Sequence, residues 1–137
     1  MWWIYALLSA VFAALTAIFA KVGIKDVNTD LATAIRTVVI LIIAWGIVFF
    51  RGGASGVSAL TRNNLIFLCL SGVATGLSWI FYFKALQSGK VSQVAPVDKS
   101  SVAIAIILAM VFLGETITLK VAIGTALIIA GTIVMIL

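Results

Sequence analysis

Five long apolar runs, separated by short polar segments, dominate the pattern of hydrophobic and polar positions along the chain. A helix needs about 20 mostly apolar residues to cross the hydrocarbon core of a bilayer. Each run has about that length, so the pattern predicts an all-α integral membrane domain with five transmembrane helices over residues 1–137. The expected helix bounds are residues 2–20, 31–50, 64–83, 91–113 and 119–137.

The short segments between the runs hold the residues that favour turns and helix caps. Asn28, Thr29 and Asp30 offer an N-cap for the second helix. The Gly-rich stretch 52–56 predicts a flexible connection, and residues 87–90 predict a tight turn. These connections leave no room for a separate soluble domain within the chain.

The composition excludes several classes of protein. Hydrophobic residues make up 64% of the chain and charged residues 9%, whereas soluble domains are about 25% charged. The chain has no histidine and a single cysteine, Cys69, within an apolar run. We therefore expect no metal site, no cofactor and no enzymatic centre. The net charge of +5 comes from scattered residues and forms no basic patch, so we expect no nucleic-acid partner.

The basic residues of the loops are divided almost evenly between the two sides of the membrane. One side carries four of them and the other three, so the bias is 4 − 3 = 1. The two sets are Lys21, Lys25, Lys84 and Lys90 on one side, and Arg51, Arg62 and Lys120 on the other. Short-loop Lys and Arg asymmetry sets orientation. The count leaves open a weak N-out orientation and a dual topology, in which the chain inserts both ways and pairs with its inverted copy.

Three charged residues, Arg36, Asp98 and Lys99, lie inside the predicted spans. Intramembrane charges mark functional sites by default because burying them unpaired is costly. Arg36 either snorkels to the headgroups or lines a cavity. Asp98 and Lys99 follow Pro96, which disturbs the fourth helix. Helix neighbours point about 100° apart, so we expect no tight salt bridge between them. They form either a structural interhelical pair, for instance Asp98 with Arg36, or a ligand or proton site.

A polar stripe runs along the third helix. Its members, at helical spacing, are Ser71, Thr75, Ser78 and Tyr82. The adjacent face holds Gly72 and Gly76, with Trp79 beyond them. Either the stripe makes interhelical hydrogen bonds or it shapes a cavity, and the two glycines indicate close helix packing.

Several motifs in the second half of the chain resemble the EamA-like branch of the drug/metabolite transporter superfamily. They are Tyr82-Phe83-Lys84-Ala85-Leu86-Gln87-Ser88-Gly89, Phe112-Leu113-Gly114-Glu115, and Gly124-Thr125-Ala126-Leu127-Ile128-Ile129-Ala130-Gly131. The first two look like the family's Y-x-x-A-L-x-x-G and F-L-G-E helix ends, and the third looks like its G-x-x-L-I-x-x-G helix. The order and the spacing of the motifs both agree, and the five-helix count covers the whole chain.

The resemblance implies a secondary transporter, most simply an exporter, in the cytoplasmic (inner) membrane. Usual members contain two five-helix units of opposite orientation, so this chain corresponds to one half of an inverted-repeat transporter and is expected to work as an antiparallel homodimer. The seven-residue spacing of Gly124 and Gly131 is similar to that of the dimerising helix in small multidrug resistance proteins. Those proteins carry a proton-coupling glutamate beside a phenylalanine in helix one. Here Ala13 follows Phe12 and helix one has no acid, so if the chain couples transport to protons, Asp98 is the only carboxylate well inside a span.

These observations lead to a functional hypothesis with two rivals. The chain is expected to move a small polar or amphipathic metabolite across the lipid bilayer by alternating access. Arg36 and Lys99 would hold an anionic group, and Asp98 would bind an amine or a coupling proton. Ser78, Trp79 and Tyr82 would shape the cavity. The rivals are a lipid-carrier flippase and a non-transporting accessory subunit of the membrane.

Overall fold

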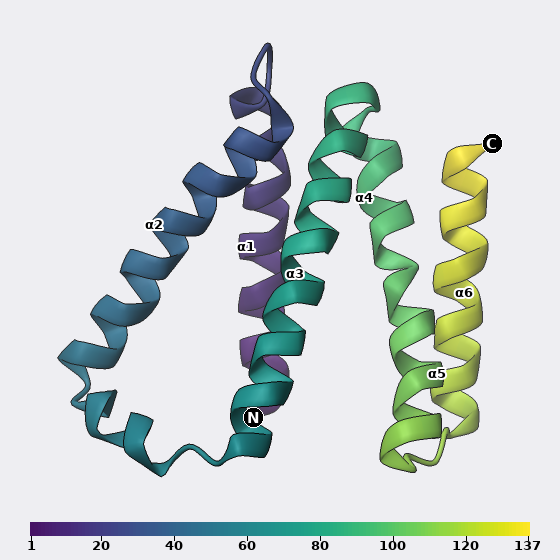
Figure 1. Cartoon of the computed structure of the whole chain (residues 1–137). Helices are drawn as coiled ribbons and strands as arrows, with labels where there is room; N and C mark the ends of the chain where they lie inside the picture. The colour runs from purple at the N-terminus through teal and green to yellow at the C-terminus, as the bar shows by residue number, and fades with distance from the viewer. The chain divides into compact units, whose positions relative to one another are not determined.

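A computed structural model describes all residues, 1–137, and contains helices but no strands (Figure 1). Its elements are α1 (Trp2–Gly23), α2 (Thr29–Phe50), the 3₁₀ helix η1 (Gly53–Ala59), α3 (Arg62–Ser88), α4 (Val91–Lys99), α5 (Ser101–Leu113) and α6 (Leu119–Ile136). Five stretches are long and apolar enough to cross a membrane: α1, α2, α3, α4 together with α5, and α6. The prediction of an all-helical chain with five candidate membrane spans is confirmed.

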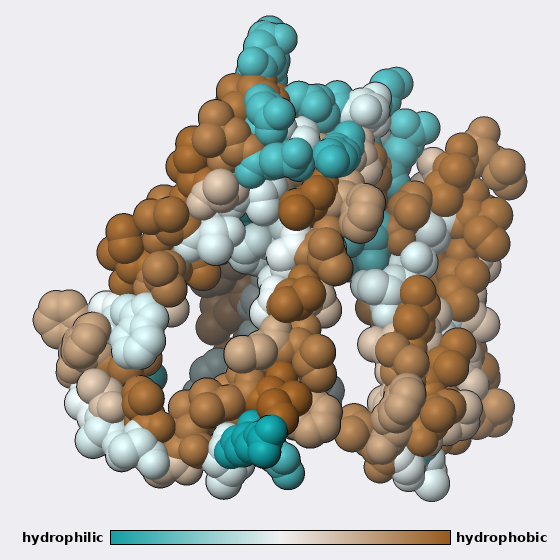
Figure 2. Space-filling view, in the orientation of Figure 1, coloured by the Kyte–Doolittle hydropathy of each residue, from teal (hydrophilic) through white to brown (hydrophobic).

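Apolar side chains cover the outer surface of these helices. In the most apolar window of each span, at most 11% of the residues are buried within the protein. Figure 2 shows hydrophobic residues along the helices and hydrophilic residues gathered near their ends. A surface of this kind is stable only where lipid replaces water as the solvent. The fold is therefore that of a multi-pass membrane protein.

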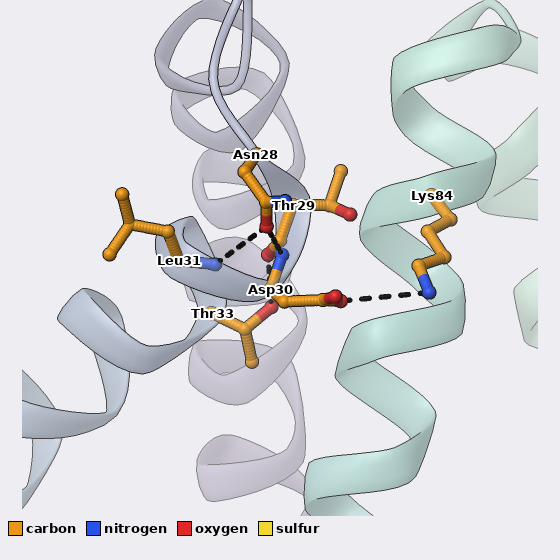
Figure 3. A network of polar contacts seen from close by, with 6 residues as sticks. All are labelled: Asn28, Thr29, Asp30, Leu31, Thr33 and Lys84. Atoms are coloured by element: carbon orange, nitrogen blue, oxygen red, sulfur yellow. Dashed lines mark hydrogen bonds and ion pairs between the residues drawn. The ribbon is translucent and has the colours of Figure 1, made fainter.

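The start of α2 is fixed by local hydrogen bonds (Figure 3). The Asn28 side chain accepts hydrogen bonds from the backbone N–H groups of Asp30 and Leu31, at 2.8 and 3.1 Å. The predicted N-cap is thus confirmed. Further along α2, the hydroxyl of Thr33 donates to the carbonyl of Thr29, and that of Thr37 to the carbonyl of Thr33, both at 2.8 Å. Such bonds satisfy hydroxyl groups inside a membrane without a partner helix.

Two connections differ from the expected ones. After α2, Gly52 adopts a left-handed conformation with φ of 68°, and the chain then forms η1 instead of a plain flexible connection. The hydroxyl of Ser58 donates to the carbonyl of Ser55 at 2.9 Å within this short helix. The second connection is the one between α3 and α4. There α3 continues to Ser88 and so includes part of the segment expected to be a turn. Small side chains in 53–56 allow the tight 3₁₀ winding.

The fourth span is divided at Ser100 into α4 and α5. Pro96 lies inside α4, where it removes a backbone N–H donor and disturbs the helical ladder. The sequence pattern predicted this disturbance but not the interruption at Ser100, whose backbone stays in the right-handed helical region. At the far end of α5, Gly114 adopts φ of 66°, and the N–H of Glu115 donates to the carbonyl of Ala109 at 3.3 Å. This left-handed glycine closes the helix as its position after the apolar run indicates.

The chain forms two compact units, which are described separately. The central unit comprises residues 19–87, and its buried apolar side chains include Ile24, Phe83 and Leu86. Within it, α2 and α3 lie near each other where α2 begins and α3 ends, and they separate toward η1 (Figure 1). The terminal unit comprises residues 1–18 and 88–137, in which α4 packs along α6.

Candidate functional site

The guanidinium group of Arg36 lies against two aromatic rings of α3 in the central unit. Its central carbon is 4.4 Å from the ring centre of Phe83 and 5.2 Å from that of Trp79. At 1.5 Å per residue, Arg36 lies about 10 Å from the start of α2. The side chain is therefore held against the rings of a neighbouring helix.

One nitrogen of this guanidinium, Nη1, is buried and has no hydrogen-bond partner. Cation–π contacts contribute about 0.5–2 kcal/mol each. A buried charged donor without a hydrogen bond costs about as much or more, and the cost rises inside a membrane. The two rings thus stabilise the charge without satisfying its donor. An anionic group that reached Nη1 would complete the hydrogen bonding.

The local sequence explains how α2 and α3 come to hold this group. Thr29, Thr33 and Arg36 follow i, i+4, i+7 spacing and so share one face of α2. Both threonines are buried. On α3, Trp79 and Phe83 are four residues apart and share a face in the same way. The long arginine side chain reaches from α2 to the two rings of α3.

Toward the membrane surface, a salt bridge links the same two helices. Lys84 Nζ lies 3.6 Å from the carboxylate of Asp30, and Figure 3 shows the pair reaching across from α3 to α2. Both side chains are more than half exposed, so the pair contributes little to stability. The sequence indicated Asp30 only as part of the N-cap of the second helix, and its partnership with Lys84 was not predicted.

The remaining predicted residues of α3 differ in their surroundings. Tyr82 is half-buried, and its ring centre lies 5.8 Å from that of Phe83. Ser78 is exposed. The structure therefore brings Arg36, Trp79 and Tyr82 to one aromatic region, with Ser78 on the surface of the helix. Phe83 was missed because nothing distinguishes it from the other apolar residues of its run. The available signal was its four-residue spacing from Trp79, which places both rings on one face of the helix.

Asp98 and Lys99 lie together in the terminal unit, at the end of α4. Lys99 Nζ lies 3.2 Å from Asp98 Oδ2, with Lys99 58% and Asp98 33% exposed. The expectation that these neighbours form no tight salt bridge is wrong. It assumed an unbroken helix and rigid side-chain directions, whereas α4 ends at Lys99 and the long lysine side chain curls back to its neighbour. Each charge is thereby neutralised locally.

A buried threonine ties α6 to the disturbed part of α4. Thr132 Oγ1 lies 3.2 Å from the carbonyl oxygen of Pro96 and 2.8 Å from that of Ile128, and donates to these acceptors. The predicted packing glycines, in contrast, have open surroundings. A Cβ atom built at any of them would meet no other atom within 4 Å. These positions are Gly72, Gly76, Gly124 and Gly131.

Comparison with known proteins agrees with this architecture. The sequence model of the EamA-like transporter family matches residues 1–137. The chain is 48% identical over 134 residues to a Sinorhizobium protein described as an uncharacterized transporter in the cobO 3′ region. The matched residues make up 98% of this chain and 95% of that protein. No solved structure matches the chain. The family is one of transporters, not of enzymes. This chain, a multi-pass membrane protein, therefore belongs to the EamA-like transporter family.

Proposed function

We propose that the chain is a secondary transporter, working as an exporter, for a small polar or amphipathic metabolite that carries an anionic group. The observation that carries the proposal is the buried, unpartnered Nη1 atom of Arg36, whose guanidinium lies against the rings of Trp79 and Phe83. A carboxylate or phosphate is the group that a guanidinium binds best. Because this donor lies inside a membrane span, a bound anion gains more there than it would in water.

The aromatic residues around Arg36 support a substrate with an apolar part. Trp79 and Phe83 hold the guanidinium from one side, and Tyr82 lies beside Phe83. Rings of this kind provide a large contact area with few rotatable bonds. Trp79 and Tyr82, with Ser78 further along the exposed surface of α3, would contact the body of the substrate while Arg36 binds its anionic group.

The Asp98–Lys99 salt bridge is proposed as the coupling site. Its carboxylate would take up a proton or an amine, and the ammonium group of Lys99 would then be released from the salt bridge. The proposal is supported by the position of the pair at a break between two helices, a place where transporters often bind coupling ions. In this scheme, the net charge of the pair changes during each transport cycle.

We further propose that the chain is one domain and one half of the functional transporter, and that it works as an antiparallel homodimer. Two inverted copies rocking about the substrate would give alternating access. The seven-residue spacing of Gly124 and Gly131 on α6, with open space beside each, supports contact with a second chain, because small residues let helix backbones approach closely. Gly72 and Gly76 provide a second surface of the same kind on α3.

The first test is a thermal-shift screen of the purified protein against organic anions, organic cations, amino acids, sugars and polyprenyl phosphates. A ligand that binds the folded state raises the apparent melting temperature by mass action. We expect soluble anionic metabolites to stabilise the wild type and to have little effect on Arg36→Ala. Stabilisation by organic cations alone would contradict the anion site. Stabilisation by polyprenyl phosphates alone would favour a flippase.

The homodimer is tested at the glycines of α6. Replacing Gly124 and Gly131 together with leucine places two large side chains where the backbones are proposed to meet, so we expect most of the protein to become monomeric in detergent. Mass photometry or crosslinking would measure the change. Gly46→Leu, at another open helix glycine, is the matched control and should leave the dimer intact. A wild-type protein that is monomeric in lipid nanodiscs would contradict the proposal.

A further inference from the structure

A small pocket lies at the end of the central unit, apart from Arg36. It is lined by Lys21, Ile24, Lys25 and Gln87, and its volume is about 150 Å³. At about 30 Å³ per water molecule, this space holds about five of them. A phosphate group, with five heavy atoms, therefore fits within it.

The walls of the pocket are held in place by hydrogen bonds. The amide nitrogen of Gln87 donates to the carbonyl groups of Ile24 and Val27, at 3.2 and 2.9 Å. Lys21 Nζ donates to the carbonyl of Leu86. Ile24 is almost completely buried and closes the inner side. The connection between α1 and α2 is thus fixed to the end of α3, and the pocket is formed before any ligand arrives.

The pocket is electropositive. Its lining includes two lysines and no acidic residue. Lys25 is exposed and makes neither a hydrogen bond nor a salt bridge within the chain. Of the nearby carboxylates, Asp30 is paired with Lys84, and Asp26 follows Lys25 without lining the pocket. The ammonium group of Lys25 is therefore available to donate hydrogen bonds to an anion.

The position of the pocket along the helices indicates the source of such an anion. Lys21 lies in the last turn of α1, directly after an apolar run, and Gln87 lies in the last turn of α3. Figure 2 shows hydrophilic residues gathered over this end of the unit. Basic residues at the ends of membrane helices lie at the level of lipid headgroups, and basic pockets there bind anionic headgroups.

We propose that this pocket binds a phosphate group at the membrane surface, either in the headgroup of an anionic phospholipid or as a free phosphate ion. Lys25 is the principal ligand, and Lys21 adds positive charge from the pocket wall. This site is independent of the proposed transport site, because its residues lie at the helix ends and Arg36 lies within the span. Its occupant regulates or stabilises the transporter and is not its cargo.

The test compares thermal stability of the full chain in an uncharged detergent with three probes. They are dioctanoyl phosphatidylglycerol, dioctanoylglycerol with the same acyl chains but no phosphate, and sodium phosphate against sodium chloride at equal ionic strength. Each is titrated against the wild type, Lys25→Gln and the control Lys120→Gln. Lys120 lies in the first turn of α6, outside the pocket, so its removal lowers the net charge equally without touching the site.

We expect a phosphate-bearing probe to raise the melting temperature of the wild type and of Lys120→Gln, with a concentration for half-maximal effect at least tenfold higher for Lys25→Gln. A response to phosphatidylglycerol alone assigns the pocket to a lipid headgroup, and a response to inorganic phosphate as well shows that the ion suffices. The proposal is overturned if neither phosphatidylglycerol nor inorganic phosphate raises the melting temperature of the wild type. It is also overturned if dioctanoylglycerol raises it equally well, or if Lys25→Gln responds like Lys120→Gln.

Discussion

Replacing Arg36 with alanine is expected to lower the transport rate of the anionic substrate at least tenfold, with little effect on stability. Loss of a charge-assisted hydrogen bond costs about 1.5–3 kcal/mol, which corresponds to roughly a 10- to 150-fold loss of affinity. The folded state loses two cation–π contacts but also loses an unsatisfied buried donor. These two effects are similar in size and opposite in sign, so the melting temperature should change by only a few degrees.

Transport into proteoliposomes and thermal unfolding of the same preparations would measure both quantities. Arg36→Lys keeps the charge but not the planar fork of donors, so we expect it to retain only part of the activity. Arg62→Ala, at the exposed start of α3, is the matched control and should transport normally. Wild-type transport by Arg36→Ala would show that the guanidinium has no part in binding substrate.

The second large effect is expected at the Asp98–Lys99 pair. Asp98→Asn keeps the size of the side chain but removes the carboxylate that the coupling proposal requires. We expect at least a tenfold loss of proton-driven transport, together with loss of its dependence on the pH gradient. Lys99→Gln should have a smaller effect, because it leaves the carboxylate in place. The measurement is uptake with and without an imposed pH gradient.

The double variant Asp98→Asn/Lys99→Gln separates coupling from structure. If the two residues serve only as a salt bridge, removing both charges together should restore the activity that each single variant loses, since no unpaired charge remains. If Asp98 carries the coupling proton, the double variant stays as inactive as Asp98→Asn alone. Full activity of the double variant would therefore contradict the coupling role.

The five spans were predictable because lipid imposes a simple rule on the sequence. A membrane helix must be apolar for about 20 residues, and the loops that connect such helices must be polar. The N-cap at Asn28 was predictable for a similar reason, since its side chain satisfies donors that the helix itself cannot. Charged residues inside the spans, such as Arg36, stood out because they break the rule.

The partners of those charged residues were harder to predict. Phe83, which contacts Arg36, is one apolar residue among many, and only a knowledge of helix packing distinguishes it from lipid-facing neighbours. The Asp98–Lys99 pair was misjudged because ideal helix geometry was assumed across a point where the helix ends. Pro96 indicated a disturbance, but not its position, which is at Ser100, four residues further along the chain.

The hydrogen bonding of Thr132 to the carbonyl of Pro96 has a mechanical consequence for a dimeric transporter. Pro96 is two residues before Asp98. One hydrogen bond and two residues of backbone therefore connect α6 to the residue that bears the carboxylate. If α6 lies at the interface of the proposed homodimer, a movement at that interface would reach the proposed coupling residue, Asp98, through α4 and without passing through the lipid-facing helices. A movement of the partner subunit would then be transmitted to Asp98 through the hydroxyl group of Thr132.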